Sequence, residues 1–218
     1  MPLGIYLERE VDADGAYVLS ALLIGLALAC LALAGLPALR RRSYQPQARR
    51  LHEMDVDKLR ALTRPTDAPA LSVTVDGVRT DFSPRAITAV VGPNGSGKTT
   101  LMGHAAGRLS GGEVSPEGAD VVLLTQRPGL PPRSTAVEAV AMVTRDKVRA
   151  QELLAAAGLH ELADVPVPAL SGGQAAHVAL VRALAARPAV LILDEPLAAV
   201  GVKSAERWRR FLHAARED

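Results

Sequence analysis

The chain has 218 residues, with 25 Lys and Arg against 23 Asp and Glu, so its formal net charge is only +2. The length allows one compact domain of ordinary size and an appendage. Because most basic residues are interspersed with acidic ones, the sequence predicts no nucleic-acid partner, which would require a concentrated basic face. The single cysteine, Cys30, excludes an intramolecular disulfide, and aromatic residues make up only 3% of the chain. Any core must therefore be built mainly from Ala, Leu and Val.

The first 39 residues contain a stretch without charged side chains, residues 17–36. As a helix rising about 1.5 Å per residue, this stretch would be about 30 Å long, which is the thickness of the hydrocarbon core of a bilayer. Acidic residues precede it, and five arginines follow it: Arg40, Arg41, Arg42, Arg49 and Arg50. Such an excess of arginine is typical of the cytoplasmic side. We therefore expect residues 1–39 to hold one transmembrane helix, at about 17–36, with the rest of the chain in the cytoplasm. A signal peptide and a buried core helix are the alternatives.

Residues 40–69 are predicted to form a linker that is basic at its start, helix-like over Leu51–Leu62 and rich in proline at its end. In residues 70–218, short β-branched runs alternate with longer stretches rich in Ala and Leu. The predicted strands are an edge strand at Leu71–Val75, buried strands at Ala86–Val91 and Val121–Leu124, and a central parallel strand at Val190–Leu193. The predicted helices are Thr99–Arg108, Lys147–Ala157, Gly173–Ala186 and Lys203–Ala215. Strands that alternate with helices predict an α/β fold with crossover connections.

The run from Gly92 to Thr99 fits the phosphate-binding pattern G-x-x-x-x-G-K-[ST], between an apolar segment and a helix-forming run. Glycines allow the backbone N–H groups to point at phosphates, and the helix N-terminus adds its positive dipole end. We expect Lys98 to contact the β- and γ-phosphates and the Thr99 hydroxyl to bind Mg²⁺. The predicted nucleotide contacts of this loop are Gly92, Pro93, Asn94, Gly95, Ser96, Gly97, Lys98, Thr99 and Thr100.

Two carboxylates, Asp194 and Glu195, directly follow the apolar run Val190–Leu193. If this run is a buried strand, they lie at its C-terminal edge, where ligands bind in open α/β sheets. Asp194 is predicted to hold Mg²⁺, directly or through water, and Glu195 to polarise the attacking water as a general base.

A third motif, Leu-Ser-Gly-Gly-Gln at residues 170–174, begins another predicted helix. There the Ser171 hydroxyl and the amides of Gly172 and Gly173 would form an anion site with the helix dipole. With the three motifs in this order, the sequence from Ala70 to about Gly201 resembles the nucleotide-binding domains of the ATP-binding cassette (ABC) family.

The resemblance implies a P-loop NTPase fold with a helical subdomain at about Arg133–Val167, binding ATP and Mg²⁺. It also implies that two cassettes enclose two nucleotides, with Ser171, Gly172, Gly173 and Gln174 facing the γ-phosphate held by the opposite cassette. Gln126 matches the family's glutamine that contacts Mg²⁺ and water. The implied catalytic residues are thus Lys98, Gln126 and Glu195, and the implied metal ligands are Thr99, Gln126 and Asp194.

Three positions depart from the family's pattern. Phe82, the one aromatic residue between Pro69 and Gly92, lies too close to the loop to be the family's adenine-stacking residue. The segment Leu197–Gly201 lacks the usual aspartate, and no histidine stands at the family's switch position about 30 residues after Glu195. His213 is expected on a helix surface, Trp208 and Phe211 on that helix's packing face. The remaining histidines, His52, His104, His160 and His177, are scattered without the spacing of metal ligands.

The resulting functional prediction is an ATP-binding and ATP-hydrolysing subunit of an ABC transporter, attached to the cell membrane by a single helix with its ATP-binding domain in the cytoplasm. Its expected partners are a second ABC cassette and a transmembrane permease subunit. A membrane-tethered ATP-binding switch or assembly subunit with weak or no hydrolysis is the alternative. The altered Leu197–Gly201 segment and the missing switch position favour the alternative, whereas Gln126, Ser171 and Glu195 favour the enzyme.

Overall fold

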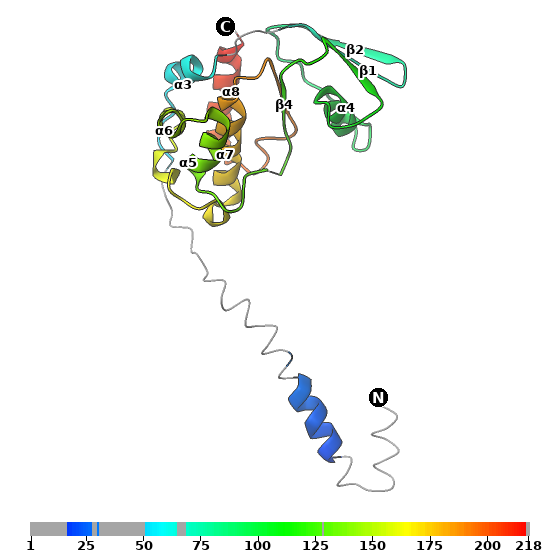
Figure 1. The fold of residues 1–218 in the computed structure, drawn as a ribbon, viewed down its shortest axis with the longest axis vertical. Helices are drawn as coiled ribbons and strands as arrows, with labels where there is room; N and C mark the ends of the chain where they lie inside the picture. The colour runs from blue at the N-terminus through cyan, green and yellow to red at the C-terminus, as the bar shows by residue number, and fades with distance from the viewer. Residues whose placement is uncertain (1–16, 28–29, 31–50, 65–68, 128, 217–218) are drawn as a thin grey trace. The chain divides into compact units, whose positions relative to one another are not determined.

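The computed structural model describes residues 17–27, 30, 51–64, 69–127 and 129–216, and the chain divides into two compact units, Met1–Gln45 and Pro46–Asp218. In the first unit, residues 17–27 are helical (Figure 1). Among all the described residues, no helix is both long and apolar enough to cross a bilayer. The predicted transmembrane helix over residues 17–36 therefore has no support from the structure; its residues 28–29 and 31–36 lie outside the described part. Residues 40–50, the predicted basic start of the linker, also lie outside the described part of the chain.

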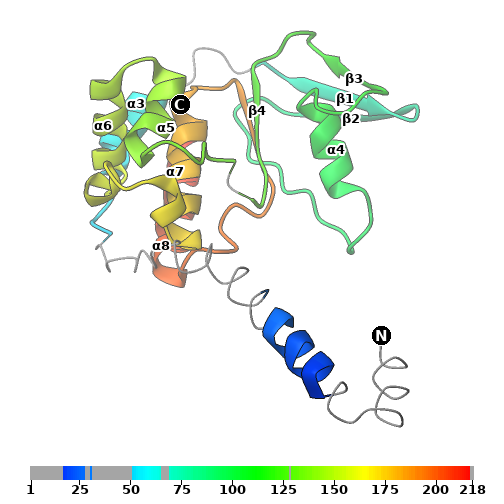
Figure 2. The ribbon, with the colours of Figure 1, turned by 60° about the horizontal axis from the view of Figure 1, so that its bottom comes forward.

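The second unit alternates helices and strands. Before the P-loop it has α3 (Val56–Thr63), β1 (Leu71–Val75) and β2 (Val78–Phe82), and after the loop α4 (Lys98–Ala105), β3 (Gly112–Ser115) and β4 (Val121–Leu124). The following elements are α5 (Ala136–Thr144), α6 (Lys147–Ala156), the 3₁₀ turns η1 (His160–Leu162) and η2 (Val167–Ala169), α7 (Gly172–Ala185), β5 (Val190–Leu193) and α8 (Val202–Ala215). Figure 2 shows α3, α5, α6, α7 and α8 on one side of β4, with α4 and the strands β1 to β3 on the other.

The strands form two sheets. β1 is the central strand of an antiparallel sheet of order β2-β1-β3, so the prediction of an edge strand at Leu71–Val75 is wrong, because β2 and β3 pair with both of its edges. β4 pairs in parallel with β5 so that Leu124 lies opposite Leu193. The hairpin between β1 and β2 turns at Asp76 and Gly77, whose φ angles are +50° and +77°. Two consecutive residues with positive φ are what a two-residue hairpin turn of the favoured hand requires.

The helices enclose the larger hydrophobic core. The indole of Trp208 and the ring of Phe211, both on α8, are fully buried and meet edge to face at 5.8 Å between centroids. The largest other fully buried side chains of this core are Leu59, Leu153, Leu154, Leu159, Leu162, Leu180, Val137, Val140 and Val178. Trp208 and Phe211 thus form the packing face of α8, as the sequence predicted. A smaller core around Leu71, Val73 and Ala105 joins α4 to β1, and Phe82 packs against it.

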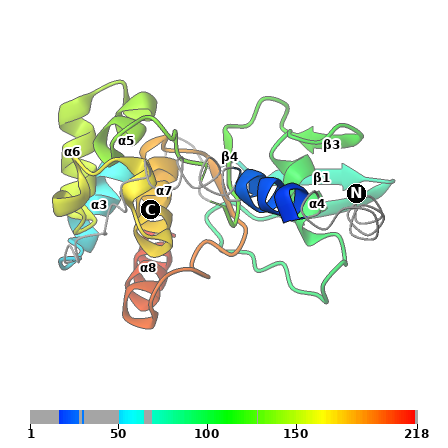
Figure 3. The ribbon, with the colours of Figure 1, turned by 90° about the horizontal axis from the view of Figure 1, so that it is seen from below.

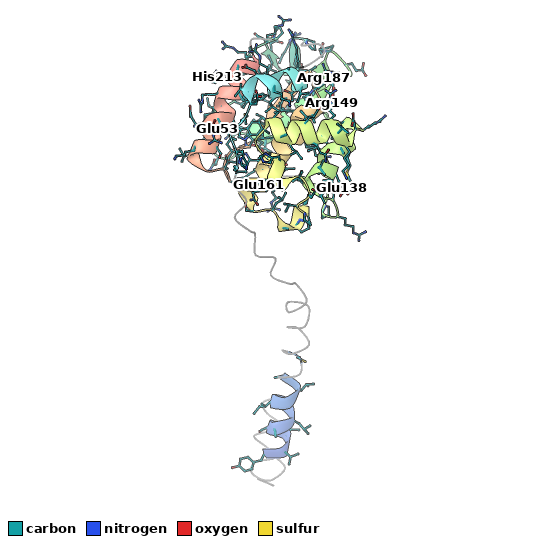
Figure 4. All side chains as sticks on the ribbon, turned by 90° about the vertical axis from the view of Figure 1, so that its left-hand side faces the viewer. Glu53, Glu138, Arg149, Glu161, Arg187 and His213 are labelled. Atoms are coloured by element: carbon teal, nitrogen blue, oxygen red, sulfur yellow. The ribbon has the colours of Figure 1, made fainter. Side chains whose placement is uncertain are left out.

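Side-chain caps explain where the helices of this region begin. The hydroxyl of Thr135 accepts from the amide of Glu138, whose carboxylate accepts from the Thr135 amide in return, so α5 starts with a capping box. Figure 4 labels Glu138 on this helix. Asp146 caps α6 by accepting from the amides of Val148 and Arg149. α5 lies within the predicted helical region Arg133–Val167, where no individual helix had been predicted before Lys147.

The predicted buried strand Ala86–Val91 is wrong. This segment has no strand structure, and the side chains of Ile87 and Val91 are 52% and 86% exposed. An apolar run forms a strand only where a neighbouring strand pairs with its N–H and C=O groups. Among the described residues, β5 pairs with β4 alone, so no ladder includes this segment. The helix predicted at Thr99–Arg108 ends earlier, at Ala105, shortly before Gly107 takes a φ of +64°.

His177, on α7, is buried against α8 with 5% of its surface exposed. The indole N–H of Trp208 donates to its Nδ1 at 2.6 Å, an arrangement that requires this nitrogen to be unprotonated. Burial, with a smaller contribution from the positive charge of Arg207, lowers the pKa of His177 from 6.5 to about 4. The folded protein therefore holds this imidazole neutral.

We expect the free energy of unfolding to fall as the pH drops from 7 to 5. In this window the unfolded chain binds a proton at His177 that the folded chain does not, which costs about 2 kcal/mol of stability. Urea unfolding at pH 7, 6 and 5 measures the loss. A His177→Gln variant should show a loss smaller by about that amount, and equal pH slopes for variant and parent would contradict the assignment.

Candidate nucleotide site

The backbone of the P-loop depends on its glycines. Gly95 and Gly97 have φ angles of +82° and +85°, in the left-handed region that residues with a Cβ rarely adopt. A Cβ added to Gly92 would lie 2.8 Å from the hydroxyl oxygen of Ser96. The loop is solvent-exposed over most of its length, so its concave backbone is accessible to a ligand.

The loop ends where α4 begins, at Lys98. Gly97 is the N-cap and supplies no side-chain hydrogen bond to the first turn, so the backbone amides at this end of α4 are not capped by it. A helix end without a side-chain cap, with the positive end of the helix dipole, is suited to bind an anion. The Nζ of Lys98 donates to the carbonyl oxygens of Gly92 and Pro93 at 2.9 and 2.8 Å, which holds the ammonium group against the loop.

The strand β5 brings Asp194 to this loop. The Thr99 hydroxyl donates to Oδ2 of Asp194 at 3.3 Å, although the two residues are 95 positions apart. The Asp194 amide donates to the carbonyl of Leu124 at 2.9 Å, which extends the pairing of β4 and β5 by one bond. The predicted metal ligands Thr99 and Asp194 are therefore adjacent at the end of the two-stranded sheet.

Glu195 and Gln126 form a second pair at the same end. The side-chain amide of Gln126, which follows β4, donates to Oε2 of Glu195 at 3.3 Å. Glu195 has a φ of +48°, a conformation that costs a non-glycine residue of the order of 1 kcal/mol and concentrates at functional sites.

The side chains at the start of α4 and after the ends of β4 and β5 fit a magnesium ion. They provide a hydroxyl, two carboxylates and an amide oxygen, and Mg²⁺ prefers oxygen ligands with a few carboxylates among them. The residues that would hold it are Thr99, Asp194 and Gln126, beside a loop suited to phosphates. One Mg²⁺ there would offset negative charge on phosphate oxygens.

The Leu-Ser-Gly-Gly-Gln motif begins α7, in the helical part of the unit. Ser171 is the N-cap: its hydroxyl accepts from the amide of Gln174 at 3.2 Å, and the Gln174 side chain accepts from the Ser171 amide at 3.0 Å. Ser171 and Gly172 are exposed. Figure 3 shows α7 and α4 on opposite sides of β4, so this motif stands apart from the P-loop of the same chain.

The helix α7 is in close contact with the segment after Glu195. A Cβ added to Gly173 would lie only 2.9 Å from the carbonyl oxygen of Ala199, whereas one added to Gly172 would meet nothing within 4 Å. Only a glycine at position 173 therefore lets the segment Leu197–Gly201 approach the start of the helix this closely.

A cavity in the second unit is separate from the phosphate loop. Its volume is about 770 Å³, and it lies between β5 and the segment 82–90, with lining residues from α3, α4 and α8. None of its lining residues belongs to the loop Gly92–Thr99 or to the motif at residues 170–174.

Sequence reasoning missed one side-chain cluster. His52, His160 and Glu161 place their ligand atoms within 4.8 Å of one another, although the histidines had been predicted to be scattered without metal-ligand spacing. No local signal could reveal the cluster, because His52 and Glu161 are 109 positions apart and only the tertiary fold brings them together.

Substituting Gly173 and Gly172 separately tests the contact with Ala199. Alanine in a helix is favoured over glycine by about 1 kcal/mol, so Gly172→Ala should leave the free energy of unfolding unchanged or raise it. Gly173→Ala should instead be less stable than Gly172→Ala by about 1 kcal/mol or more, because the backbone at Ala199 must shift. Urea unfolding without nucleotide gives both values, and equal stability of the two variants would exclude the close approach.

Comparison with known proteins agrees with this geometry. Residues 75–198 match the family model described as ABC transporter. The sulfate/thiosulfate import ATP-binding protein CysA of Ralstonia nicotianae is 36% identical over 170 residues, which cover 67% of this chain and 46% of that protein. The tungstate uptake system ATP-binding protein TupC of Peptoclostridium acidaminophilum is 36% identical over 146 residues, covering 59% of this chain and 68% of that protein. The chain thus spans between about half and two thirds of the length of these curated relatives.

Solved structures show the same fold. A chain of an inward-facing ABC transporter aligns with a TM-score of 0.57 at 23% identity, covering 68% of each chain. An ATP-binding cassette solved as a dimer in a post-hydrolysis state, bound to ADP and Pi, aligns with a TM-score of 0.52 at 28% identity, covering 57% of this chain and 67% of that one. With the P-loop, the paired carboxylates and the helix-capping serine motif in place, this chain belongs to the ATP-binding proteins of the ABC transporter family.

Proposed function

We propose that this chain is the ATP-binding and ATP-hydrolysing subunit of an ABC transporter. The observation that carries the proposal is the meeting of two pairs beside the P-loop, Thr99 with Asp194 and Gln126 with Glu195, each at 3.3 Å. The relatives CysA, TupC and the taurine protein TauB of Mesorhizobium japonicum are named as ATP-binding proteins of import or uptake systems. Their names favour import as the direction of transport.

ATP binding is assigned to the P-loop. Its glycines let the backbone amides surround the phosphates, the N-terminus of α4 favours negative charge, and Lys98 needs to move only from the carbonyls of Gly92 and Pro93 to reach a phosphate oxygen. The contacts proposed along the loop run from Gly92 through Thr100. Phe82 packs against the smaller core, so no aromatic base stack is assigned to it.

Hydrolysis is assigned to Glu195 and its neighbours. Its carboxylate accepts a hydrogen bond from Gln126, and the pair together would orient a water molecule in line with the terminal phosphate. Lys98 would neutralise charge that develops on the phosphate oxygens. Such reactions are accelerated mainly by positioning and electrostatic stabilisation, which a preformed arrangement of these side chains provides.

The proposed partners are a second cassette and a transmembrane permease subunit. Ser171 and the first amides of α7 form an exposed anion site that lies apart from the P-loop of its own chain. A second cassette would bring this surface of one chain to the nucleotide of the other. The dimeric cassette bound to ADP and Pi supports such an arrangement.

We also propose that residues 17–36 attach the chain to the cell membrane with the ATP-binding unit in the cytoplasm. The uncharged stretch with arginines after it supports this proposal, and residues 17–27 are helical. The exposed side chains of this helix include Tyr17, Val18, Leu22, Ile24 and Leu26, each more than 60% exposed.

Glu195→Gln tests the hydrolytic function. We expect the variant to bind ATP as the parent does but to lose nearly all turnover, because an amide cannot act as the base that glutamate provides. Phosphate release and the binding of labelled ATP, both in the presence of Mg²⁺ and at several protein concentrations, measure the two properties. Parent turnover per molecule should rise with protein concentration, because one molecule cannot complete its own site.

Two further variants define the outcomes. Lys98→Ala should weaken ATP binding about tenfold or more, since hydrogen bonds to charged groups contribute about 1.5–3 kcal/mol, and Glu152→Gln, an exposed position on α6, should change nothing. Unchanged turnover in Glu195→Gln would contradict the assigned base. ATP binding without turnover in the parent, under every condition, would instead establish an ATP-binding switch.

Membrane attachment is tested on the full chain. In bacterial cells the chain should remain in the membrane fraction after alkaline washing, and a phosphatase reporter fused to its C-terminus should be inactive, because the reporter works only outside the cytoplasm. A variant with Leu23 and Leu26 replaced by arginine should be released, since arginine within a span costs about 3 kcal/mol or more. Recovery of the parent chain in the wash would contradict the proposal.

A further inference from the structure

The cluster of His52, His160 and Glu161 combines side chains from two distant parts of the second unit. His52 lies in the segment that leads into α3, and His160 and Glu161 form the start of η1. The Nε2 of His52 lies 2.7 Å from Oε1 of Glu161, and the two imidazole rings are 4.2 Å apart between centroids, tilted by 37°. All three ligand atoms lie within 4.8 Å of one another.

The backbone holds both halves of the cluster in place. The His52 amide donates to the carbonyl of Gly158 at 2.9 Å, and its carbonyl accepts from the guanidinium of Arg207 at 2.9 Å. A Cβ added to Gly158 would lie closer to the His52 carbonyl than real Cβ atoms ever do, so the two segments are in direct contact. On the other side, Leu159 and Leu162 are buried in the core and fix η1.

The chemistry of the three ligands selects the ion. Two imidazole nitrogens and one carboxylate oxygen suit Zn²⁺ and other first-row transition ions, whereas Mg²⁺ and Ca²⁺ prefer oxygen alone. Tetrahedral ligands at about 2.0–2.1 Å from zinc are about 3.3 Å apart. The ligand atoms here lie within 4.8 Å of one another, so the widest pair would have to close by up to about 1.5 Å, and the His52–Glu161 pair, now at 2.7 Å, would have to open slightly. The side chains of His52 and Glu161 are 42% and 39% exposed, which leaves a path for the ion and room for water at an open position.

Without a metal, the same contacts would contribute little. A solvent-exposed pair of His52 and Glu161 belongs to a class whose median contribution to stability is close to zero. We propose that His52, His160 and Glu161 form a binding site for a divalent transition-metal ion, with Zn²⁺ as the ion that fits best. Figure 4 shows Glu161 and Glu53, the chain neighbour of His52, on the same side of the unit.

A bound ion has a structural consequence. It connects the segment before α3 to the turn after α6, which are separated by more than 100 residues of chain. Because the site exists only in the folded protein, metal binding adds to the stability of the fold. The three ligands are independent of the residues proposed for ATP, so the site is a structural link and does not rest on the ATPase proposal.

The experiment uses the full chain without an affinity tag, in a Cys30→Ser background that removes the one thiol. After chelator treatment, Zn²⁺ binding is measured by calorimetry in excess Mg²⁺ without nucleotide, and Co²⁺ binding by its visible absorption. We expect one equivalent of Zn²⁺ to bind and to raise the unfolding temperature. In His160→Ala the affinity should fall about tenfold or more, since even the loss of an indirect partner of a metal site has this effect.

The matched control is His213→Ala, which removes an exposed histidine of α8 and should bind Zn²⁺ as the parent does. Asp194→Asn should also bind it normally, because its carboxylate belongs to the proposed magnesium site. The proposal is overturned if the parent binds no Zn²⁺, if folded His160→Ala binds it as tightly as the parent, or if Asp194→Asn abolishes the binding. Circular dichroism verifies that each variant is folded.

Discussion

The parallel pairing of β4 with β5 is the constraint on which the candidate site depends. Parallel strands end at the same edge, and here the register places Leu124 opposite Leu193. The candidate site residues come soon after the strands end: Gln126 lies two residues after β4, and Asp194 and Glu195 follow β5 directly. The bond from the Asp194 amide to the Leu124 carbonyl prolongs the pairing into the site. A register shift of one residue would turn every side chain to the opposite face, and would separate Asp194 from Thr99.

The helical half of the unit is connected to this edge through α7. Its body is buried, with Val178 and Leu180 fully enclosed in the core. Its first turn carries the exposed Ser171 at one face and Gly173 against the carbonyl of Ala199 at the other. Ala199 lies only four residues beyond Glu195, so the segment that follows the proposed base is in close contact with the start of α7.

The motifs and most elements could be predicted because their causes are local. The Gly92–Thr99 loop, the caps of α7 and the apolar runs of β4 and β5 are set by residues within a few positions, and both strands begin and end as predicted. The failures have tertiary causes. The run Ala86–Val91 has the composition of a strand but lacks a paired neighbour, and the antiparallel strands β2 and β3 exist only because β1 pairs with both. Helix α5, which is not among the predicted helices, does have a local signal, the Thr135–Glu138 capping box.

The contrast between local and tertiary causes also applies to the two groups of polar side chains, the carboxylates of the nucleotide site and the cluster of His52, His160 and Glu161. Asp194 and Glu195 can be recognised from sequence, because a strand always delivers the residues that follow it to the sheet edge. His52 meets His160 for a different reason: the segment before α3 is held to Gly158 by a backbone hydrogen bond and a contact that admits no side chain at that position. A glycine at position 158, with a φ of +73°, is required twice, by the turn that ends α6 and by the approach of His52. The cluster thus depends on close packing between the backbone at His52 and the backbone at Gly158. The spacing of histidines in the sequence cannot predict this packing.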